Sequence, residues 1–143
     1  MAYCTLDDIL KLIPQAELIL LTDDAGSGSV DSAVVSETTE RSDRLIDAML
    51  ATRYLVPFSP VPAVVADISS VLAAYELQAR RPQTMPEEWR KRRDDSMALL
   101  KLLASGGALL AGAIAAGGQA TAVPAPSFSG PSRLFDRTSL EGC

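Results

Sequence analysis

Apolar residues in the first third of the chain recur at steps of three and four positions, the spacing of one face of an α-helix. Thr5 followed by Asp8 is a short version of the capping box, so a first helix is expected to begin there and to stop at Pro14. A second helical segment is expected over Gln15 to Leu21, before a glycine-containing loop over residues 22–29. The pattern therefore predicts two short helices and then a loop.

A longer helix is expected next, from a cap at Ser29 or Asp31 to about Arg53, with its polar face toward water. Its expected buried positions are Val30, Val34, Thr38, Leu45, Met49 and Thr52. Three prolines between Tyr54 and Pro62 forbid a continuing helix or a central strand. We therefore expect a rigid, extended connector over this segment.

Two further helices are expected after the connector. Pro62 suits the first position of a helix that runs to about Arg80 and is expected to be central in the fold. Its expected buried residues are Val64, Ile68, Val71, Leu72 and Tyr75. The next helix is expected to open with a capping box between Thr84 and Glu87. Its expected core residues are Trp89, Met97, Leu100 and Leu103.

The character of the sequence changes after Ser105. Glycines interrupt an Ala/Leu stretch, and prolines and serines follow over residues 123–131, so regular packed structure is not expected there. The last segment, 132–140, alternates charged with large apolar residues and is typical of a tail that needs a partner. We therefore expect a mainly α protein: a four- to five-helix bundle over residues 1–105, then a Gly/Ala-rich stretch and an extended C-terminal arm over 106–143.

Composition favours binding over catalysis. Of the 143 residues, 48% are apolar but only 5% aromatic, which favours a core of packed helices. The chain contains no histidine, the side chain that most often serves as general base or transition-metal ligand near neutral pH. Cys4 and Cys143 form neither a disulfide framework nor a metal or redox motif, and no secretory signal is evident. We expect no enzyme activity, catalytic residue, cofactor or metal.

Charge is distributed unevenly along the chain. Residues 1–47 carry ten acids against three bases, whereas residues 76–101 carry seven bases against five acids. Opposite fields of this kind would suit either an intramolecular contact or head-to-tail association of copies. The strongest basic cluster is Arg90, Lys91, Arg92 and Arg93. It could contact phosphates, but a solvated helix face with neighbouring acids is the favoured interpretation because no row of aromatic residues accompanies it.

Two other motifs are weak. The loop Asp23–Gly28 superficially suggests a calcium site, but glycines replace expected oxygen ligands and the closing glutamate is absent, so a flexible linker is favoured. The stretch Leu99 to Ala116 approaches the length of a membrane span, but Lys101 and the paired glycines argue against one.

Three segments carry a resemblance to a known family. They are the opening Met-Ala-Tyr-Cys-Thr-Leu-Asp-Asp-Ile-Leu, the Tyr-Leu-Val-Pro-Phe-Ser-Pro-Val-Pro of residues 54–62, and the Arg-Leu-Phe-Asp-Arg-Thr-Ser-Leu of residues 133–140. In this order and spacing they resemble the phage Mu-like head-to-tail connector proteins, adaptor or head completion proteins formerly known only as a phage domain of unknown function. The resemblance runs from Met1 to about Ala104 and resumes at Phe128. The stretch Gly106 to Ala122 matches the family least.

The resemblance implies a structural virion protein, assembled in the host cytoplasm. Such a helical adaptor docks as a ring, usually of twelve copies, beneath the portal and then receives the tail. The implied partners are other copies, the portal protein and a tail-side connector or tail terminator protein, with DNA passing through the channel without sequence-specific contact and no membrane involved. We expect the arm to bind a different chain through Phe128, Arg133, Leu134, Phe135, Arg137 and Leu140.

Alternatives remain open at this point. Arg90 to Arg93 either meet the acidic region of an adjacent copy or face the portal or DNA. The whole chain could instead be a small membrane-active, holin-like phage protein, or a cytoplasmic regulatory protein whose tail captures a partner.

Overall fold

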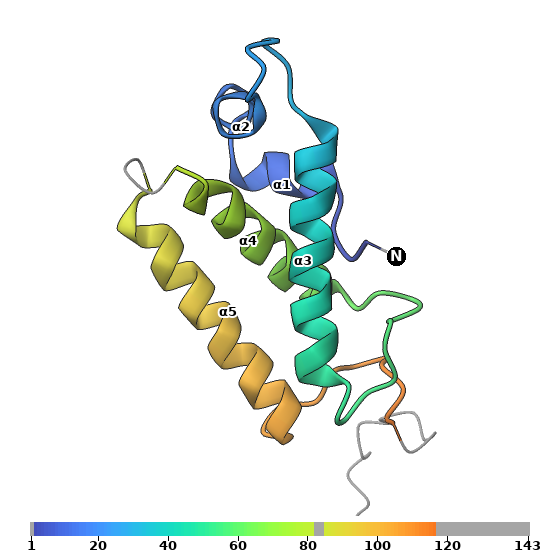
Figure 1. Cartoon of the computed structure of the whole chain (residues 1–143). Helices are drawn as coiled ribbons and strands as arrows, with labels where there is room; N and C mark the ends of the chain where they lie inside the picture. The colour runs from blue at the N-terminus through green and yellow to red at the C-terminus, as the bar shows by residue number, and fades with distance from the viewer. Residues whose placement is uncertain (1, 82–84, 117–143) are drawn as a thin grey trace, which may run out of the picture.

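The computed structural model describes residues 2–81 and 85–116. These residues form five helices: α1 (Leu6–Leu12), α2 (Gln15–Thr22), α3 (Ser32–Leu50), α4 (Ala63–Ala79) and α5 (Glu87–Ser105). Figure 1 shows α3, α4 and α5 as the long members, with α1 and α2 at one end. Helix α4 contacts each of the other four, as expected for the central helix. The predicted mainly helical bundle is confirmed.

The helix starts follow local capping chemistry. Thr5 and Asp8 form the expected capping box, in which the Asp8 amide donates to Thr5 Oγ1 and the Thr5 amide donates to Asp8 Oδ2. Asp31 caps α3 by accepting from the amide of Ala33 at 2.9 Å. Of the capping box expected between Thr84 and Glu87, Thr84 lies outside the described residues; the structure starts α5 at Glu87, with Pro86 rather than Thr84 at the N-cap position. Proline has no side-chain oxygen to offer the first amides of the helix.

The buried face of α3 differs from the expected one by about one position. Leu45 is 41% exposed, whereas Ile46 is fully buried. The buried residues of the helix are Val35, Thr39, Ser42, Asp43, Ile46 and Leu50. Both sets of positions have helical spacing, and the buried set includes an acid that the apolar pattern excluded. Burial of that acid is tolerated because its carboxylate is hydrogen-bonded.

Helix α4 is buried around most of its circumference. Ile68 and Leu72 are buried as expected, but Val64 is 42% exposed and the buried valine is Val65. In α5, Leu100 and Leu103 enter the core as expected, while Met97 and Trp89 are partly buried.

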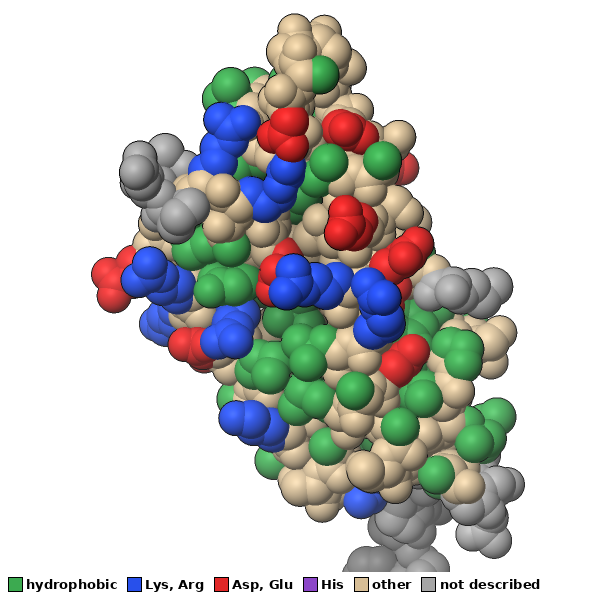
Figure 2. Space-filling model, in the orientation of Figure 1, with side chains coloured by type: hydrophobic (Ala, Val, Ile, Leu, Met, Phe, Trp, Pro, Cys, Tyr) green, Lys and Arg blue, Asp and Glu red, His purple; other side chains and the backbone are tan. Residues whose placement is uncertain are grey.

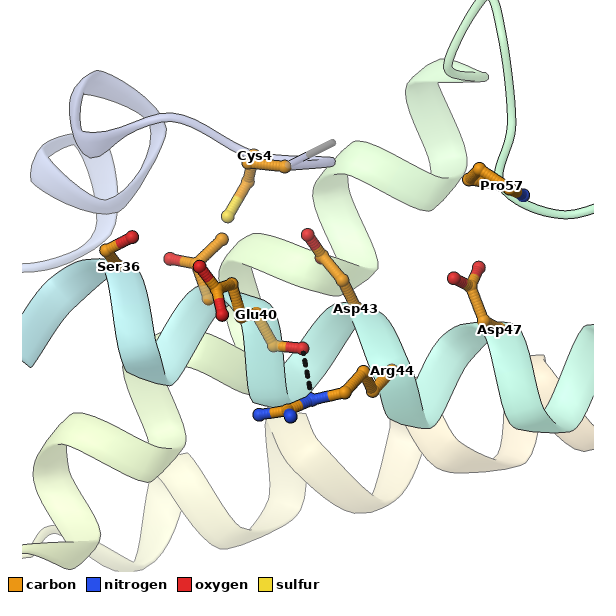
Figure 3. Close-up of a pocket in the computed structure, with 9 residues that line it drawn as sticks. Cys4, Ser36, Glu40, Asp43, Arg44, Asp47 and Pro57 are labelled. Atoms are coloured by element: carbon orange, nitrogen blue, oxygen red, sulfur yellow. Dashed lines mark hydrogen bonds between the residues drawn. The ribbon is translucent and has the colours of Figure 1, made fainter.

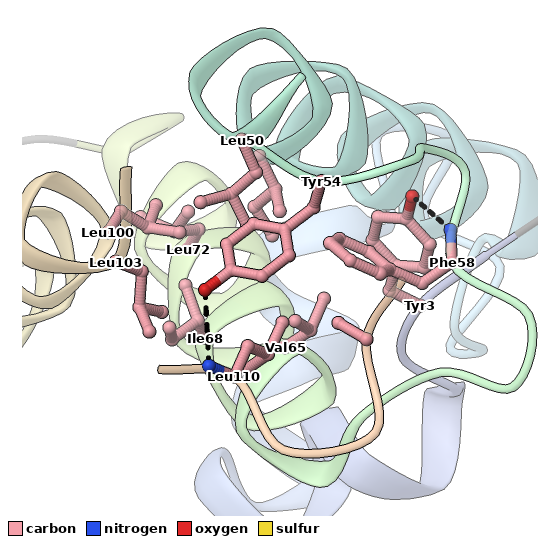
Figure 4. Packing of buried hydrophobic residues seen from close by; sticks show 12 residues of the cluster. Tyr3, Leu50, Tyr54, Phe58, Val65, Ile68, Leu72, Leu100, Leu103 and Leu110 are labelled. Atoms are coloured by element: carbon pink, nitrogen blue, oxygen red, sulfur yellow. Dashed lines mark hydrogen bonds between the residues drawn. The ribbon is translucent and has the colours of Figure 1, made fainter. Parts of the chain in front are cut away.

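Two apolar clusters make up the core, and α4 contributes to both. One lies among α3, α4, α5 and the segments around them, and Figure 4 shows its side chains. Its members are Tyr3, Ile46, Leu50, Tyr54, Phe58, Val65, Ile68, Leu72, Leu100, Leu103, Leu110 and Ala113. The other joins α1 and α2 to α4. Its members are Cys4, Ile9, Ile13, Leu18, Leu21, Val35, Ala73, Ala74 and Leu77.

Residues 106–116 pack against the bundle, so the expectation of no packed structure after Ser105 is wrong for this segment. Leu110 is 2% exposed, and its amide donates to the Tyr54 hydroxyl at 3.2 Å (Figure 4). The Leu55 amide donates to the Ile114 carbonyl at 2.9 Å, within an antiparallel bridge between Tyr54 and Ala115. The segment between α3 and α4, expected to be extended, thus supplies the surface on which residues 106–116 lie. The remainder of the stretch and arm predicted over 106–143, residues 117–143, lies outside the described residues.

Gly106 makes the turn into this segment possible. It has a φ of 87°, in the left-handed region, and a Cβ there would lie 2.1 Å from Arg53 Nη1. A side chain at this position would therefore be strained, and the guanidinium end of Arg53 would have to move aside.

We predict that Leu110→Ala lowers the free energy of unfolding by about 2–5 kcal/mol, because it removes a buried side chain and leaves a cavity. Leu109→Ala is the matched control: Leu109 is 48% exposed, and its truncation should change stability by no more than about 0.5 kcal/mol. Urea unfolding followed by circular dichroism measures both. Equal effects of the two variants would show that residues 106–116 do not pack as described.

Candidate functional site

A groove with an apolar floor and an arginine rim lies between α3 and α5. Its volume is about 340 Å³, and its lining comes from α3, α4 and α5. The lining residues are Arg41, Ser42, Leu45, Leu72, Tyr75, Glu76 and Arg93. Figure 2 shows this face of the molecule, where hydrophobic side chains gather between α3 and α5 and Lys and Arg side chains lie around them. We call it the arginine-rimmed groove.

The rim cations are held by weak contacts at the surface. Arg41 Nη1 lies 3.6 Å from Glu76 Oε2, and Arg93 Nη1 lies 2.9 Å from Asp94 Oδ1. The Arg93 guanidinium also stands over the ring of Tyr75, 5.5 Å from its centroid. Exposed ion pairs of this kind stabilise a protein by less than about 1 kcal/mol, so these cations can exchange partners readily.

The predicted basic cluster on α5 divides into two pairs. Arg92 pairs with Glu88 at 2.6 Å and stands over the Trp89 ring, as Arg93 does over Tyr75. Arg90 and Lys91 are exposed and form no ion pair within the described part of the chain. The cluster is therefore partly neutralised by its own helix, and two of its four cations remain available to a partner.

A second apolar groove lies on another side of α5. It has a volume of about 320 Å³ and is lined by α4 and α5 only. Its lining residues are Val64, Asp67, Ile68, Val71, Ser96 and Leu99. Val64 and Leu99 are more than one-third exposed, and Asp67 is the charged residue in the lining. We call it the Asp67 groove.

A polar network attaches the N-terminal segment to α3 and α4. Asp43 is buried, and its carboxylate accepts from the Tyr3 amide at 2.9 Å and from Ser69 Oγ at 2.6 Å. The Tyr3 hydroxyl donates to Asp47 Oδ1 and accepts from the Phe58 amide. Neither Asp43 nor Ser69 was expected in the core, although Thr39, Asp43, Ile46 and Leu50 follow helical spacing and could have indicated this face.

Beside this network lies a polar pocket of about 420 Å³ (Figure 3). Ser36, Glu40, Asp43 and Asp47 project from one side of α3, with Cys4 opposite. Desolvation raises the pKa of the Asp43 carboxyl and that of the Cys4 thiol. A raised pKa leaves less thiolate near neutral pH, so this environment does not activate Cys4 as a nucleophile.

The loop after α2 uses its acidic groups internally. The Asp23 carboxylate accepts from the amides of Ser27 and Gly28, and these bonds lower the pKa of Asp23. Asp24 pairs with Arg80, whose guanidinium also donates to the Leu21 carbonyl. Among the described residues, no group of His, Cys, Asp or Glu side chains is placed to hold a metal ion.

Two further predictions concern a membrane span and the C-terminal arm. No helix in the described ranges is both long and apolar enough to cross a membrane. The predicted partner-binding residues of the arm lie outside the described residues. They are Phe128, Arg133, Leu134, Phe135, Arg137 and Leu140. The two grooves, which the sequence reasoning did not identify, are therefore the main described candidates for contact with a partner.

Two comparisons with known proteins cover much of the chain. The model of a protein family described as "Bacteriophage Mu, Gp36" matches residues 3–126. A curated protein, "Mu-like prophage FluMu protein gp36" from Haemophilus influenzae, is 33% identical over 78 residues. That match covers 54% of this chain and 53% of the relative, so the chain spans about half the length of the relative it matches.

We predict that Asp43→Ala lowers the free energy of unfolding by about 2–4 kcal/mol, because it leaves the buried Tyr3 amide and Ser69 hydroxyl without their acceptor. Asp43→Asn should cost less, since its amide group can accept from Tyr3 and donate to Ser69. Urea unfolding compares the variants. Equal losses in both would contradict the hydrogen-bond geometry.

Comparison of the wild type with Asp43→Asn also tests the direction in which the fold shifts the pKa of Asp43. A folded-state pKa above the unfolded value means that the folded chain binds the proton more tightly, so this contribution to stability falls as pH rises above about 4. The unfolding free energy of the wild type relative to Asp43→Asn should therefore decrease from about pH 4 to pH 7. A difference that is constant or rises with pH would contradict the assigned direction.

Proposed function

The chain belongs to the bacteriophage Mu Gp36 family, and from this premise we propose that it is a structural head-to-tail connector of a tailed phage. In this proposal several copies form a ring, twelve being the expected number, beneath the portal and join the capsid to the tail. The protein is part of the virion and is assembled in the host cytoplasm. DNA passes through the ring without sequence-specific contact.

The observation that carries the proposal is the pair of grooves on the helical bundle. An apolar floor with a charged rim suits a protein–protein interface, in which a buried apolar centre is surrounded by polar groups. The bundle also leaves Leu20, Leu55 and Leu102 between 47% and 65% exposed. A protein that works inside an assembly has neighbours that cover such surfaces.

We propose a binding role rather than a catalytic one. The chain has no histidine, and Cys4 is buried with a raised pKa. The buried carboxylate of Asp43 is engaged in structural hydrogen bonds with the N-terminal segment and α4. These features support a protein whose polar groups hold its fold together.

The proposed partners are further copies, the portal protein and a tail-side connector or tail terminator protein. The C-terminal arm, with large apolar residues between charged ones over 132–140, is proposed to bind the portal or the tail side. The basic cluster of α5 is proposed to meet an adjacent copy, because two of its cations have no ion pair in the described chain.

We predict that the purified chain forms rings on portal particles of the same phage in negative-stain images. Leu134→Ala combined with Phe135→Ala should weaken portal binding about tenfold or more, because large apolar anchors dominate interface energy. The matched control, Thr138→Ala with Ser139→Ala, changes two small polar residues of the same arm and should bind as the wild type does. Unchanged binding by the Leu134/Phe135 variant would exclude these residues as anchors.

Reversing all four charges of Arg90, Lys91, Arg92 and Arg93 to glutamate is expected to abolish ring assembly, because like charges would then meet the acidic surface of the next copy. Native mass spectrometry measures assembly, and circular dichroism confirms that the variant folds. Rings that persist while particles lose packaged DNA would instead assign the cluster to the portal or DNA.

A further inference from the structure

The two grooves flank α5 and lie on different sides of its contact with α4. From α5, Arg93 lines one groove while Ser96 and Leu99 line the other. Arg93 and Leu99 are six residues apart, which places them about 120° apart around the helix axis. From α4, the two linings share no residue. A single copy therefore presents two separate apolar grooves in different directions.

The two grooves also differ in charge. Arg41 and Arg93 stand on the rim of one, where Glu76 is the acid in the lining. The other contains Asp67 and no cation. Asp95 is outside the lining but precedes Leu99 by one helical turn, so the two side chains lie on neighbouring turns of α5. Asp67 and Asp95 are exposed, and neither has an ion pair within 4.0 Å in the described chain.

Both grooves also offer apolar surface to a partner. Their volumes, about 340 and 320 Å³, are similar, and both floors are formed by aliphatic or aromatic side chains. Val64 and Leu99 stand out from the Asp67 groove with 42% and 37% of their surface exposed. They are apolar groups that could enter a groove floored by Leu72 and Tyr75.

We propose that the Asp67 groove of one copy docks on the arginine-rimmed groove of the next, so that Asp67 and Asp95 face Arg41 and Arg93 while the apolar residues meet between them. This inference rests on the proposed function, because its occupant is a second copy of the chain within a ring. The contact joins two different surfaces, so each copy keeps one free groove for another neighbour. A repeated contact of this kind closes into a ring when its rotation allows.

The ion pairs that Arg41 and Arg93 form within one copy are weak, so both arginines can exchange them for pairs with a second copy. Arg41 gives up a 3.6 Å contact with Glu76, and Arg93 gives up a pair with its own chain neighbour Asp94. Exposed ion pairs within one copy stabilise the protein only slightly. Between two copies, the same arginines would lie at the edge of a buried apolar contact and would fix its register.

Charge exchange tests the contact. One variant carries Arg41→Glu and Arg93→Glu, and a second carries Asp67→Arg and Asp95→Arg. Each alone would bring like charges together at every contact, so neither should assemble. Mixed in equal amounts, the two restore opposite charges at every contact and should form rings in which they alternate one to one. Native mass spectrometry of the full chain, with and without portal particles, reads the composition of the rings.

The matched control is Arg44→Glu with Lys101→Glu, which changes two exposed bases on α3 and α5 that line neither groove. It should form rings as the wild type does. Circular dichroism shows that every variant folds, as expected for substitutions of exposed side chains.

The outcomes separate this inference from the proposed function. Wild-type rings together with rings from either charge variant alone would overturn the proposed contact and leave the connector function standing. Loss of assembly in the control as well, or failure of the mixture to form alternating rings, would also overturn the contact. Absence of wild-type rings, both alone and on portal particles, would overturn the proposed function itself.

Discussion

The enclosure of α4 by the other helices is the constraint on which the rest of the fold depends. A helix that touches four neighbours cannot keep a wide polar face, and α4 accordingly buries small residues such as Ser69, Ala73 and Ala74. Small side chains let neighbouring helices approach closely, while Leu72 and Leu77 fill the two core clusters. Because α4 belongs to both clusters, the N-terminal helices and the long helices form one body.

Enclosure also requires that polar groups on the packed faces find partners within the protein. Ser69 donates to Asp43, and Gln78, which is 1% exposed, donates to Glu17 at 2.6 Å. These bonds connect α4 to α3 and to α2, so two helices are held in register by specific polar contacts as well as by apolar packing. Two donors stabilise the buried carboxylate of Asp43, and removing either partner lowers the free energy of unfolding. The polar network is thus a structural feature that the apolar pattern of the sequence cannot reveal.

The sequence predicted where the helices begin and end better than it predicted which face of each helix is buried. Capping at Thr5 and Asp31 and breaks at proline are local effects, which a few neighbouring residues determine. The choice between Leu45 and Ile46 as the buried residue of α3 is different, because both fit a three- and four-residue spacing and only the position of α4 decides between them. Residues 106–116 escaped prediction for a related reason. Their burial depends on the Tyr54 hydroxyl and the backbone near Leu55, which lie far away in the sequence.

The grooves, like the buried face of α3, are products of tertiary packing. The linear charge pattern set an acidic first third against a basic stretch over residues 76–101. The fold nevertheless places Arg41 of the acidic third on the same groove as Arg93, and Asp67 of α4 in the other groove. The arginine-rimmed groove thus brings together charges that lie far apart in the sequence, and sequence position alone is a poor guide to them. A molecule with opposite charge on two differently directed apolar surfaces favours contact between unlike faces over contact between like faces. That preference is what the proposed ring would require, since contacts between like faces stop at a dimer.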